Sequence, residues 1–113
     1  MKTDPKSAQP LSTAAQYILL ALAREDLHGY GIIREVEQLS KGRVRLRAGT
    51  LYGALERLAG DGWVEVDGVS QDGGPPRTDY RLTAAGRRRL EAELDRLEGN
   101  VKMARARLRR KPT

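Results

Sequence analysis

The C-terminal part of the sequence carries an apolar residue at alternating intervals of four and three positions. The series consists of Leu90, Leu94, Leu97, Val101, Ala104 and Leu108. This is the heptad spacing of a helix that packs lengthwise against another helix. It predicts a long helix over residues 84–110 that pairs with a second subunit; the alternative is a helix that lies back on its own domain. Gly99 and Asn100 predict a kink or an early end, because glycine costs about 1 kcal/mol in a helix interior.

The segment from Ser12 to Ala23 is almost wholly apolar. Ser12 or Thr13 can cap a helix here. A helix that is apolar on nearly every side is buried on nearly every side. We therefore expect one face of it to enter the protein's own core and another, with Tyr17 and Ile18, to contact a second subunit. The alternative is the central helix of a compact monomer.

The remaining segments follow in a recognisable order. Apolar spacing predicts helices over residues 29–39 and 49–59, and strict alternation predicts a short strand over residues 43–47. Two further strands, over residues 63–67 and 77–82, flank a turn-rich tip. The fold class is therefore mostly α with a small β-hairpin: a winged helix-turn-helix plus a long C-terminal dimerisation helix. The expected parts are a disordered N-terminal arm (1–11), the winged domain (12–83), the dimerisation helix (84–110) and a tail (111–113).

Composition excludes several classes of function. The sequence has no cysteine and one histidine, His28, which excludes disulfides, thiolate chemistry and multi-histidine metal sites. It also lacks a Gly-rich phosphate loop. We expect no enzymatic activity, no metal and no cofactor, and we interpret His28 as a structural residue in a turn. No apolar run approaches the roughly 20 residues that span a bilayer, so we expect a cytoplasmic protein with no membrane partner.

The charge is unevenly distributed. The chain carries 21 basic and 15 acidic residues, but the first 83 residues carry 11 of each. The excess of positive charge therefore lies in the last 30 residues, and net charge alone does not predict that the folded body binds DNA.

Local motifs are more informative. Arg43, Arg45 and Arg47 alternate with apolar residues and lead into the helix that begins near Gly49. A recognition helix reads bases with its N-terminal residues, and its amide end attracts phosphate. Thr50 is suited to contact a base or a phosphate there; the alternative is that it only caps the helix. The hairpin tip ends in Pro-Pro and then Arg77, a cation suited to phosphate or to a narrow minor groove.

In combination, these motifs resemble the PadR family of bacterial transcriptional regulators. The resemblance is carried by LHGYGII (27–33), GTLYGALERL (49–58), GWV (62–64) and PRTDYRLTAAG (76–86), in family order and spacing, over about residues 12–108. It implies the short subfamily: a homodimeric repressor that binds an inverted repeat near its own or a neighbouring gene, often one for transport or for stress responses. The partners to consider from the resemblance include a small-molecule effector of unidentified chemistry; the alternative is that the chain binds none.

The resemblance and the motifs together give two sets of residues. Those expected to contact double-stranded DNA are Tyr30, Arg43, Arg45, Arg47, Gly49, Thr50, Tyr52, Arg57, Arg77, Thr78 and Tyr80. Those expected at the dimer interface are Tyr17, Ile18, Leu90, Leu94, Leu97, Val101, Ala104 and Leu108.

The sequence departs from the family pattern in two places. Family members often have Ser-Pro before the Gly-Thr-Leu-Tyr motif, where this chain has Arg47 and Ala48, so a helix cap is replaced by a cation. Some short members stack drugs between tryptophans of the long helix, but residues 84–110 here contain no aromatic residue. An alternative function is a winged-helix module that binds a protein partner instead of an operator.

Overall fold

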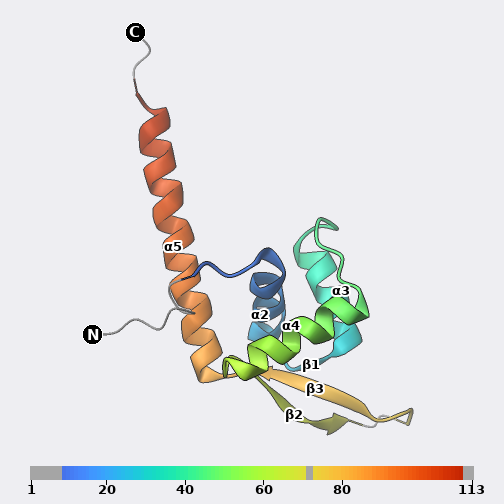
Figure 1. Ribbon diagram of the computed structural model, residues 1–113. Coiled ribbons are helices and arrows are strands. Elements are labelled where there is room, and N and C mark those ends of the chain that lie inside the picture. Colours follow the sequence, from blue (N-terminus) through green and yellow to red (C-terminus); the bar gives the residue numbers. More distant parts are fainter. Residues whose placement is uncertain (1–8, 71–72, 111–113) are drawn as a thin grey trace.

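Three helices pack over a small antiparallel sheet, and a long fourth helix leaves this body at one side (Figure 1). The computed structural model describes residues 9–70 and 73–110. Within them the elements are α2 (Thr13–Arg24), β1 (Leu27–His28), α3 (Gly29–Leu39), α4 (Ala48–Gly60), β2 (Val64–Ser70), β3 (Arg77–Leu82) and α5 (Ala84–Leu108). This arrangement confirms the predicted winged helix-turn-helix with a long C-terminal helix.

Helix α2 lies at the centre of the core. The side chain of Ser12 caps it by accepting a hydrogen bond from the Ala15 amide at 3.1 Å. Ile18 and Leu19 are fully buried in the protein's own core. The expectation that Ile18 contacts a second subunit is therefore wrong, because its side chain is already enclosed within this chain. Tyr17 is half-buried and stays a predicted interface residue.

The predicted strand over residues 43–47 does not form. Its alternation is real, because Leu46 is buried and Val44 half-buried while the three arginines are exposed. However, the Val44 amide and carbonyl bond the Ser40 hydroxyl, at 2.9 and 3.3 Å, and no neighbouring strand takes them up. The place beside β3 is instead occupied by β1, so that the sheet order is β1-β3-β2.

The wing is formed by β2 and β3, which pair in an antiparallel register from Val64 opposite Leu82 to Ser70 opposite Arg77. A bulge between Val66 and Gly68 shifts this register by one residue. On the other side of β3, Leu27 pairs with Tyr80 and His28 with Asp79. These two pairs bind the start of α3 to the wing.

A close backbone contact sets the angle at which α5 leaves the wing. Thr83 caps α5 by accepting a bond from the Gly86 amide at 2.9 Å, and its hydroxyl donates to the Gly62 carbonyl at 2.6 Å. Gly86 packs against the backbone that follows α4: a β-carbon at Gly86 would lie 2.1 Å from the Trp63 carbonyl oxygen. Only glycine fits at this position without movement of the backbone.

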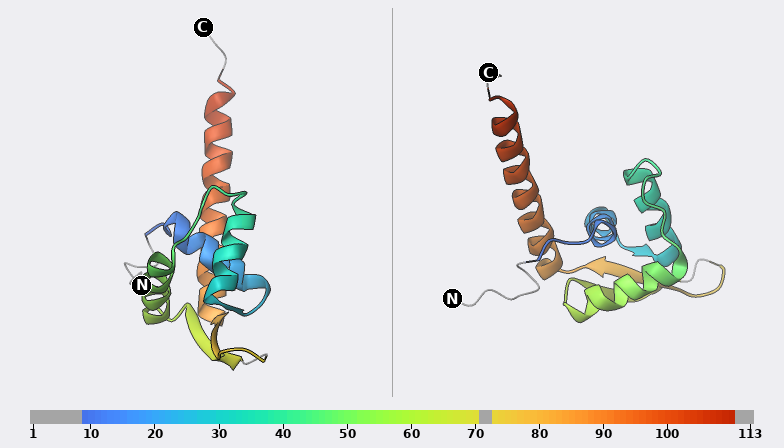
Figure 2. Two further views of the ribbon diagram at one scale, coloured as in Figure 1. Left: turned by 90° about the vertical axis from the view of Figure 1, so that its right-hand side faces the viewer. Right: turned by 45° about the horizontal axis from the view of Figure 1, so that its top comes forward.

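Helix α5 is continuous from Ala84 to Leu108, so the kink or early end predicted at Gly99 and Asn100 is wrong. Both views in Figure 2 show its distal half standing clear of the body. Its proximal half is anchored: Leu90 is buried in the core, so Leu90 belongs to the packing within this chain. Over the described ranges, none of the helices combines the length and apolarity needed to span a membrane.

Residues 9–11 lie against α5. The Leu11 amide donates to the Glu93 carboxylate at 3.2 Å, and the Arg89 guanidinium donates to the Gln9 carbonyl. Glu93 is only 1% exposed, and it also binds Arg96 at 2.7 Å and Arg89 at 3.6 Å. These residues of the predicted disordered arm are therefore fixed; residues 1–8 of the arm and the predicted tail, 111–113, lie outside the described residues.

Candidate nucleic-acid interface

The N-terminal end of α4 is open to solvent. Residues 47–50 are all exposed, and the helix begins after Arg47 without a side-chain cap. Gly49 has no neighbour within 4 Å of where a β-carbon would stand. Leu51, Ala54, Leu55 and Leu58 bury the opposite face of the helix in the core. The result is a rigid helix end whose uncapped amides can approach an anion.

A hollow separates this helix end from the wing. It is lined by His28, Gly29, Tyr30, Tyr52, Pro76, Arg77, Thr78 and Tyr80. The pairing of β1 with β3 brings the start of α3 to the base of the wing, and α4 completes the third side. Figure 1 shows these three parts on the same side of the body, away from the distal end of α5. The fold thus brings together five of the residues predicted to contact DNA.

Three tyrosines add hydroxyl groups to the polar lining of the hollow, beside His28, Arg77 and Thr78. Tyr30 is 64% exposed and Tyr52 51% exposed. Burial raises the pKa of the half-buried Tyr80, and the neighbouring Tyr52 adds to the increase. The Tyr80 hydroxyl therefore keeps its proton at neutral pH and can donate a hydrogen bond to an acceptor such as a phosphate oxygen.

The predicted cations differ in position. Arg47 adjoins α4 and Arg77 lines the hollow. Arg43 and Arg45 lie in the segment that connects α3 to α4. Arg43 is near the end of α3, and Arg45 turns towards α3, where it pairs with Glu37 at 3.5 Å. Both arginines are exposed, but the structure does not gather them at the hollow.

Arg57 lies apart from this surface. It is seven residues beyond Thr50, which places it on the same side of α4 but about 10.5 Å further along the axis. Its side chain lines a second hollow, between α4 and the start of α2. The structure does not bring Arg57 together with the residues at the helix start, so its place in the predicted DNA-contacting set finds no support.

Three residues of the first hollow, His28, Gly29 and Pro76, were not among those predicted to contact DNA. His28 was interpreted as structural, and Pro76 only as part of the hairpin tip. His28 does precede α3 without capping it, but it also lines the hollow. Its place beside Tyr30 in the Leu-His-Gly-Tyr motif was the available signal.

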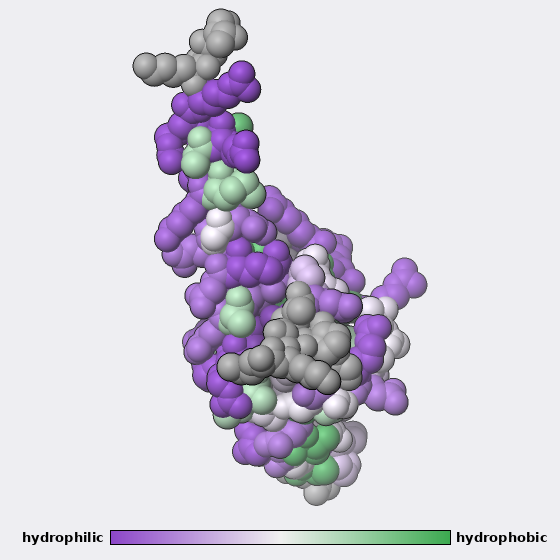
Figure 3. Space-filling view, turned by 60° about the vertical axis from the view of Figure 1, so that its left-hand side comes forward, coloured by the Kyte–Doolittle hydropathy of each residue, from purple (hydrophilic) through white to green (hydrophobic). Residues whose placement is uncertain are grey.

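The distal part of α5 offers a separate apolar stripe. Leu94, Val101 and Leu108 are 43%, 51% and 84% exposed. Leu97 is half-buried and Ala104 is exposed. Figure 3 shows hydrophobic patches among hydrophilic ones along this part of the helix. Such a stripe on a protruding helix is typical of a surface that packs against another helix.

The comparison with protein families identifies the family of this chain. The model of the transcriptional regulator PadR-like family matches residues 18–92. An uncharacterized 37.1 kDa protein in transposon TN4556 of Streptomyces fradiae is 42% identical over 91 residues, which are 78% of this chain and 25% of that protein. The chain thus spans about a quarter of the length of this curated relative.

Solved structures share the fold. A PadR family transcription regulator from Clostridium difficile R20291 superposes with a TM-score of 0.73 at 25% identity, over 86% of this chain and 99% of that one. Bacillus subtilis PadR in complex with operator DNA gives a TM-score of 0.65 at 19% identity, over 90% of this chain and 50% of that one. This second likeness concerns the fold alone.

Proposed function

The chain belongs to the PadR-like family of transcriptional regulators and is a DNA-binding winged helix-turn-helix protein, and we propose that it acts as a homodimeric repressor. In this proposal each subunit binds one half of an inverted-repeat operator beside its own gene or a neighbouring gene for transport or stress responses. The clustering of the open α4 end, the tyrosine hydroxyls and Arg77 around one hollow is the observation that supports it most.

The two contacting elements have different tasks. The start of α4, with Gly49 and Thr50, enters the major groove and discriminates between base sequences. Tyr30, Tyr52, Arg77, Thr78 and Tyr80 contact the sugar-phosphate backbone beside it. Phosphate contacts supply affinity and position but little sequence choice. Arg47 adds a phosphate contact next to the uncapped helix end, and Arg43 and Arg45 add longer-range attraction.

Dimerisation sets the spacing of the two recognition helices. The exposed stripe of α5, formed by Leu94, Leu97, Val101, Ala104 and Leu108, packs on the second subunit, with Tyr17 at its margin. Two α4 helices about 34 Å apart then reach successive major grooves on one face of the duplex. The operator is expected to share the two-fold symmetry of the dimer.

The test is a selection of DNA by purified full-length protein. Sheared genomic DNA of the source organism is incubated with the protein at about 150 mM salt, and the retained fragments are sequenced. Enrichment of one or a few promoter fragments that contain a two-fold symmetric sequence supports the proposal. Weak, uniform retention that disappears as salt is added contradicts it, and would favour a winged module that binds a protein partner.

A further inference from the structure

The distal end of α5 carries a patch of uncompensated positive charge. Residues 99–110 contain five cations and no acidic residue, and all five side chains are exposed: Lys102, Arg105, Arg107, Arg109 and Arg110. Lys102 pairs with Glu98 at 3.3 Å. Within residues 9–70 and 73–110, none of the four arginines has an acidic side chain within ion-pairing distance. We call these five side chains the distal patch.

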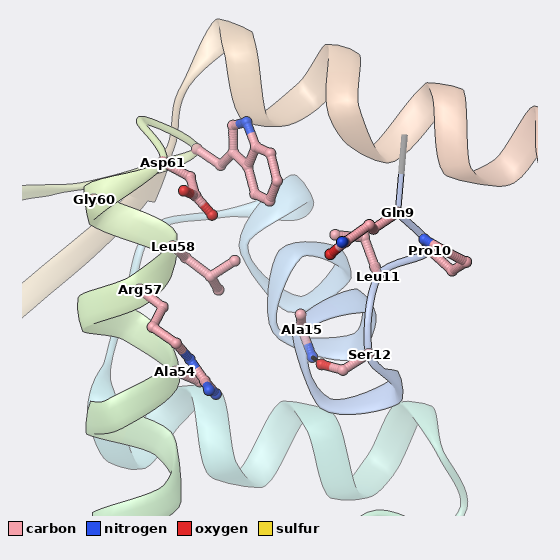
Figure 4. Close-up of a pocket in the computed structure, with 11 residues that line it drawn as sticks. Gln9, Pro10, Leu11, Ser12, Ala15, Ala54, Arg57, Leu58, Gly60 and Asp61 are labelled. Carbon is pink, nitrogen blue, oxygen red and sulfur yellow. Dashed lines mark hydrogen bonds between the residues drawn. The ribbon is translucent and has the colours of Figure 1, made fainter. Parts of the chain in front are cut away.

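The rest of the chain has no net charge. The first 83 residues carry 11 basic and 11 acidic residues, and residues 84–98 add four of each sign, so residues 99–113 hold the entire net charge of +6. The cations of the winged body are dispersed. Arg45 pairs with Glu37, and Arg81 with two acidic side chains of β2. Arg57 lies apart from both, at the hollow between α4 and the start of α2 (Figure 4).

Helix stability explains only part of this concentration. Arg105 and Arg107 lie in the last turn of α5, where cations interact favourably with the carbonyl end of the helix. Arg109 follows Arg105 by four positions, however, and like charges at this spacing repel each other and destabilise a helix. A basic segment without acidic residues is typical of a surface that binds a polyanion.

The arrangement of the cations suits a duplex. Lys102, Arg105 and Arg109 follow each other at intervals of three and four positions, so they share one side of the helix, beside the apolar stripe, over about 10.5 Å of its length. Double-stranded DNA presents about six phosphate charges over that distance, and arginine binds phosphate oxygens through paired N–H donors. A protein partner would favour an apolar core, but Met103 is the one large apolar residue of 99–110 outside the stripe.

The distal patch faces away from the start of α4 and the wing. Figure 1 and both views in Figure 2 show the distal half of α5 clear of the body, on the side away from the wing. Arg109 is 19 residues beyond the buried Leu90, which is about 28 Å along the helix axis. A two-fold axis that directs both α4 ends at one duplex keeps both distal patches on the opposite side. The patch therefore adds little to operator binding, because charges are screened beyond about 8 Å at physiological salt.

We propose that the distal patch binds a second DNA duplex, without sequence preference, through its backbone phosphates. A dimer bound to its operator then holds another segment of duplex on its far side and bridges the two. The bridge rests on the proposed function above, whereas the binding of random-sequence duplex by the patch does not.

The patch is tested first without an operator. Arg105→Gln with Arg109→Gln removes two cations of the patch, and Arg24→Gln with Arg88→Gln removes the same charge from exposed positions outside it. All proteins in this assay also carry Arg77→Ala, which weakens the surface formed by α4 and the wing for every sequence. Fluorescence anisotropy measures the affinity for a duplex of random sequence at several salt concentrations.

The two pairs of substitutions should differ in affinity and in salt dependence. The distal pair should weaken binding about tenfold or more at about 50 mM salt and lower the slope of log affinity against log salt by about 2, because two phosphate contacts are lost. The control pair should leave the slope unchanged. Sedimentation velocity and circular dichroism confirm that each variant keeps its assembly and its fold.

The bridge has its own measurement, in proteins that retain Arg77. The selected promoter fragment is fixed to beads, saturated with protein and offered a labelled duplex of random sequence. Wild type and the control pair should capture the labelled duplex, and the distal pair should capture about tenfold less, although equal amounts of all three proteins stay on the beads.

The possible failures are distinguishable. Equal salt slopes for the distal and control pairs would overturn the patch as a DNA-binding surface and favour an acidic protein as its partner. A lowered slope in the distal pair without capture of the second duplex by wild type would overturn the bridge. Absence of specific retention of any promoter fragment would count against the proposed function, and the salt slopes would still decide whether the patch binds DNA.

Discussion

The hydroxyl of Tyr52 on α4 lies directly over Gly29 at the start of α3. A β-carbon at Gly29 would stand 2.5 Å from the Tyr52 oxygen and 3.0 Å from the ring carbon that carries it. Gly29 is buried, whereas Tyr52 is half exposed to the hollow beside the wing. The missing side chain at Gly29 therefore gives the Tyr52 hydroxyl its place.

We expect Gly29→Ala to displace Tyr52 and to weaken binding of the selected DNA about tenfold, through the loss of a hydrogen bond to phosphate. The fold should survive, because the exposed Tyr52 side chain can swing away. In a Tyr52→Leu background the same substitution should have little further effect on DNA affinity, which makes the pair a double-mutant cycle. Fluorescence anisotropy measures the four affinities, and additive losses would contradict the coupling.

Gly86→Ala should destabilise the fold by about 2 kcal/mol or more, because the obstructing atom is the Trp63 backbone carbonyl and cannot rotate away. Gly99→Ala is the matched control within the same helix. It has open space around it and should instead gain about 0.5–1 kcal/mol from helix propensity. Urea unfolding at a fixed protein concentration, followed by Trp63 fluorescence, gives both values; a neutral Gly86→Ala would show that the junction is looser than described.

Glu93 should make stability depend on pH. Its hydrogen bond with Arg96 holds the pKa of Glu93 below the ordinary value of 4.5, with help from the Leu11 amide and against the effect of burial. A depressed carboxylate pKa contributes stability that is complete above the unfolded value and is lost as the pH falls through the folded one. The free energy of unfolding of wild type should therefore fall as the pH drops below about 4.5.

Glu93→Gln tests whether Glu93 is the origin of this pH dependence of stability. It leaves the buried Arg89 guanidinium without its acidic partner, and should cost about 3 kcal/mol at pH 7 and flatten the dependence below pH 4.5. Glu98→Gln, which breaks an exposed pair with Lys102, should change stability by less than about 1 kcal/mol. Urea unfolding across this pH range gives both slopes, and an unchanged slope in Glu93→Gln would assign the acid sensitivity to other groups.

Val101→Glu should convert the proposed dimer into a folded monomer. Val101 is exposed within the single chain, so the fold tolerates a charge there, whereas burial of that charge in an apolar interface is costly. Met103→Glu places the same charge on the exposed side of the helix outside the stripe and should leave the dimer intact. Sedimentation velocity distinguishes these results; a Val101→Glu dimer would exclude the stripe as the interface.

The sequence predicted the elements that have a periodic pattern. The helices around Val36 and Leu55 and the long α5 were predicted from apolar spacing, the helix around Leu19 from an almost wholly apolar segment, and the hairpin from two strands that flank a turn-rich tip. The strand expected around Val44 was wrong because alternation indicates which side chains are buried and cannot tell whether a neighbouring strand is present. The two-residue β1 was missed for the complementary reason: Leu27 and His28 are too few to show any period.

Long-range contacts account for the remaining differences between the sequence-based expectations and the structure. Arg89 and Glu93 are charged residues beside the apolar series of the long helix, yet both are buried because residues 9–11, some 80 positions earlier, pack over them. Arg57 shares a helix face with Thr50, so the pattern could not separate them; only the position of the start of α2 shows that Arg57 faces another hollow. No local motif encodes such contacts.

The central claim is that the first turn of α4 reads sequence while the wing binds backbone. Its most direct test is the affinity ratio between the selected fragment and a scrambled duplex, at one salt concentration, for wild type, Thr50→Ala and Arg77→Ala. We expect Thr50→Ala to lower this ratio by about fivefold or more. Arg77→Ala should weaken binding to both duplexes by the same factor and leave the ratio unchanged. Equal losses on both duplexes for Thr50→Ala would contradict it.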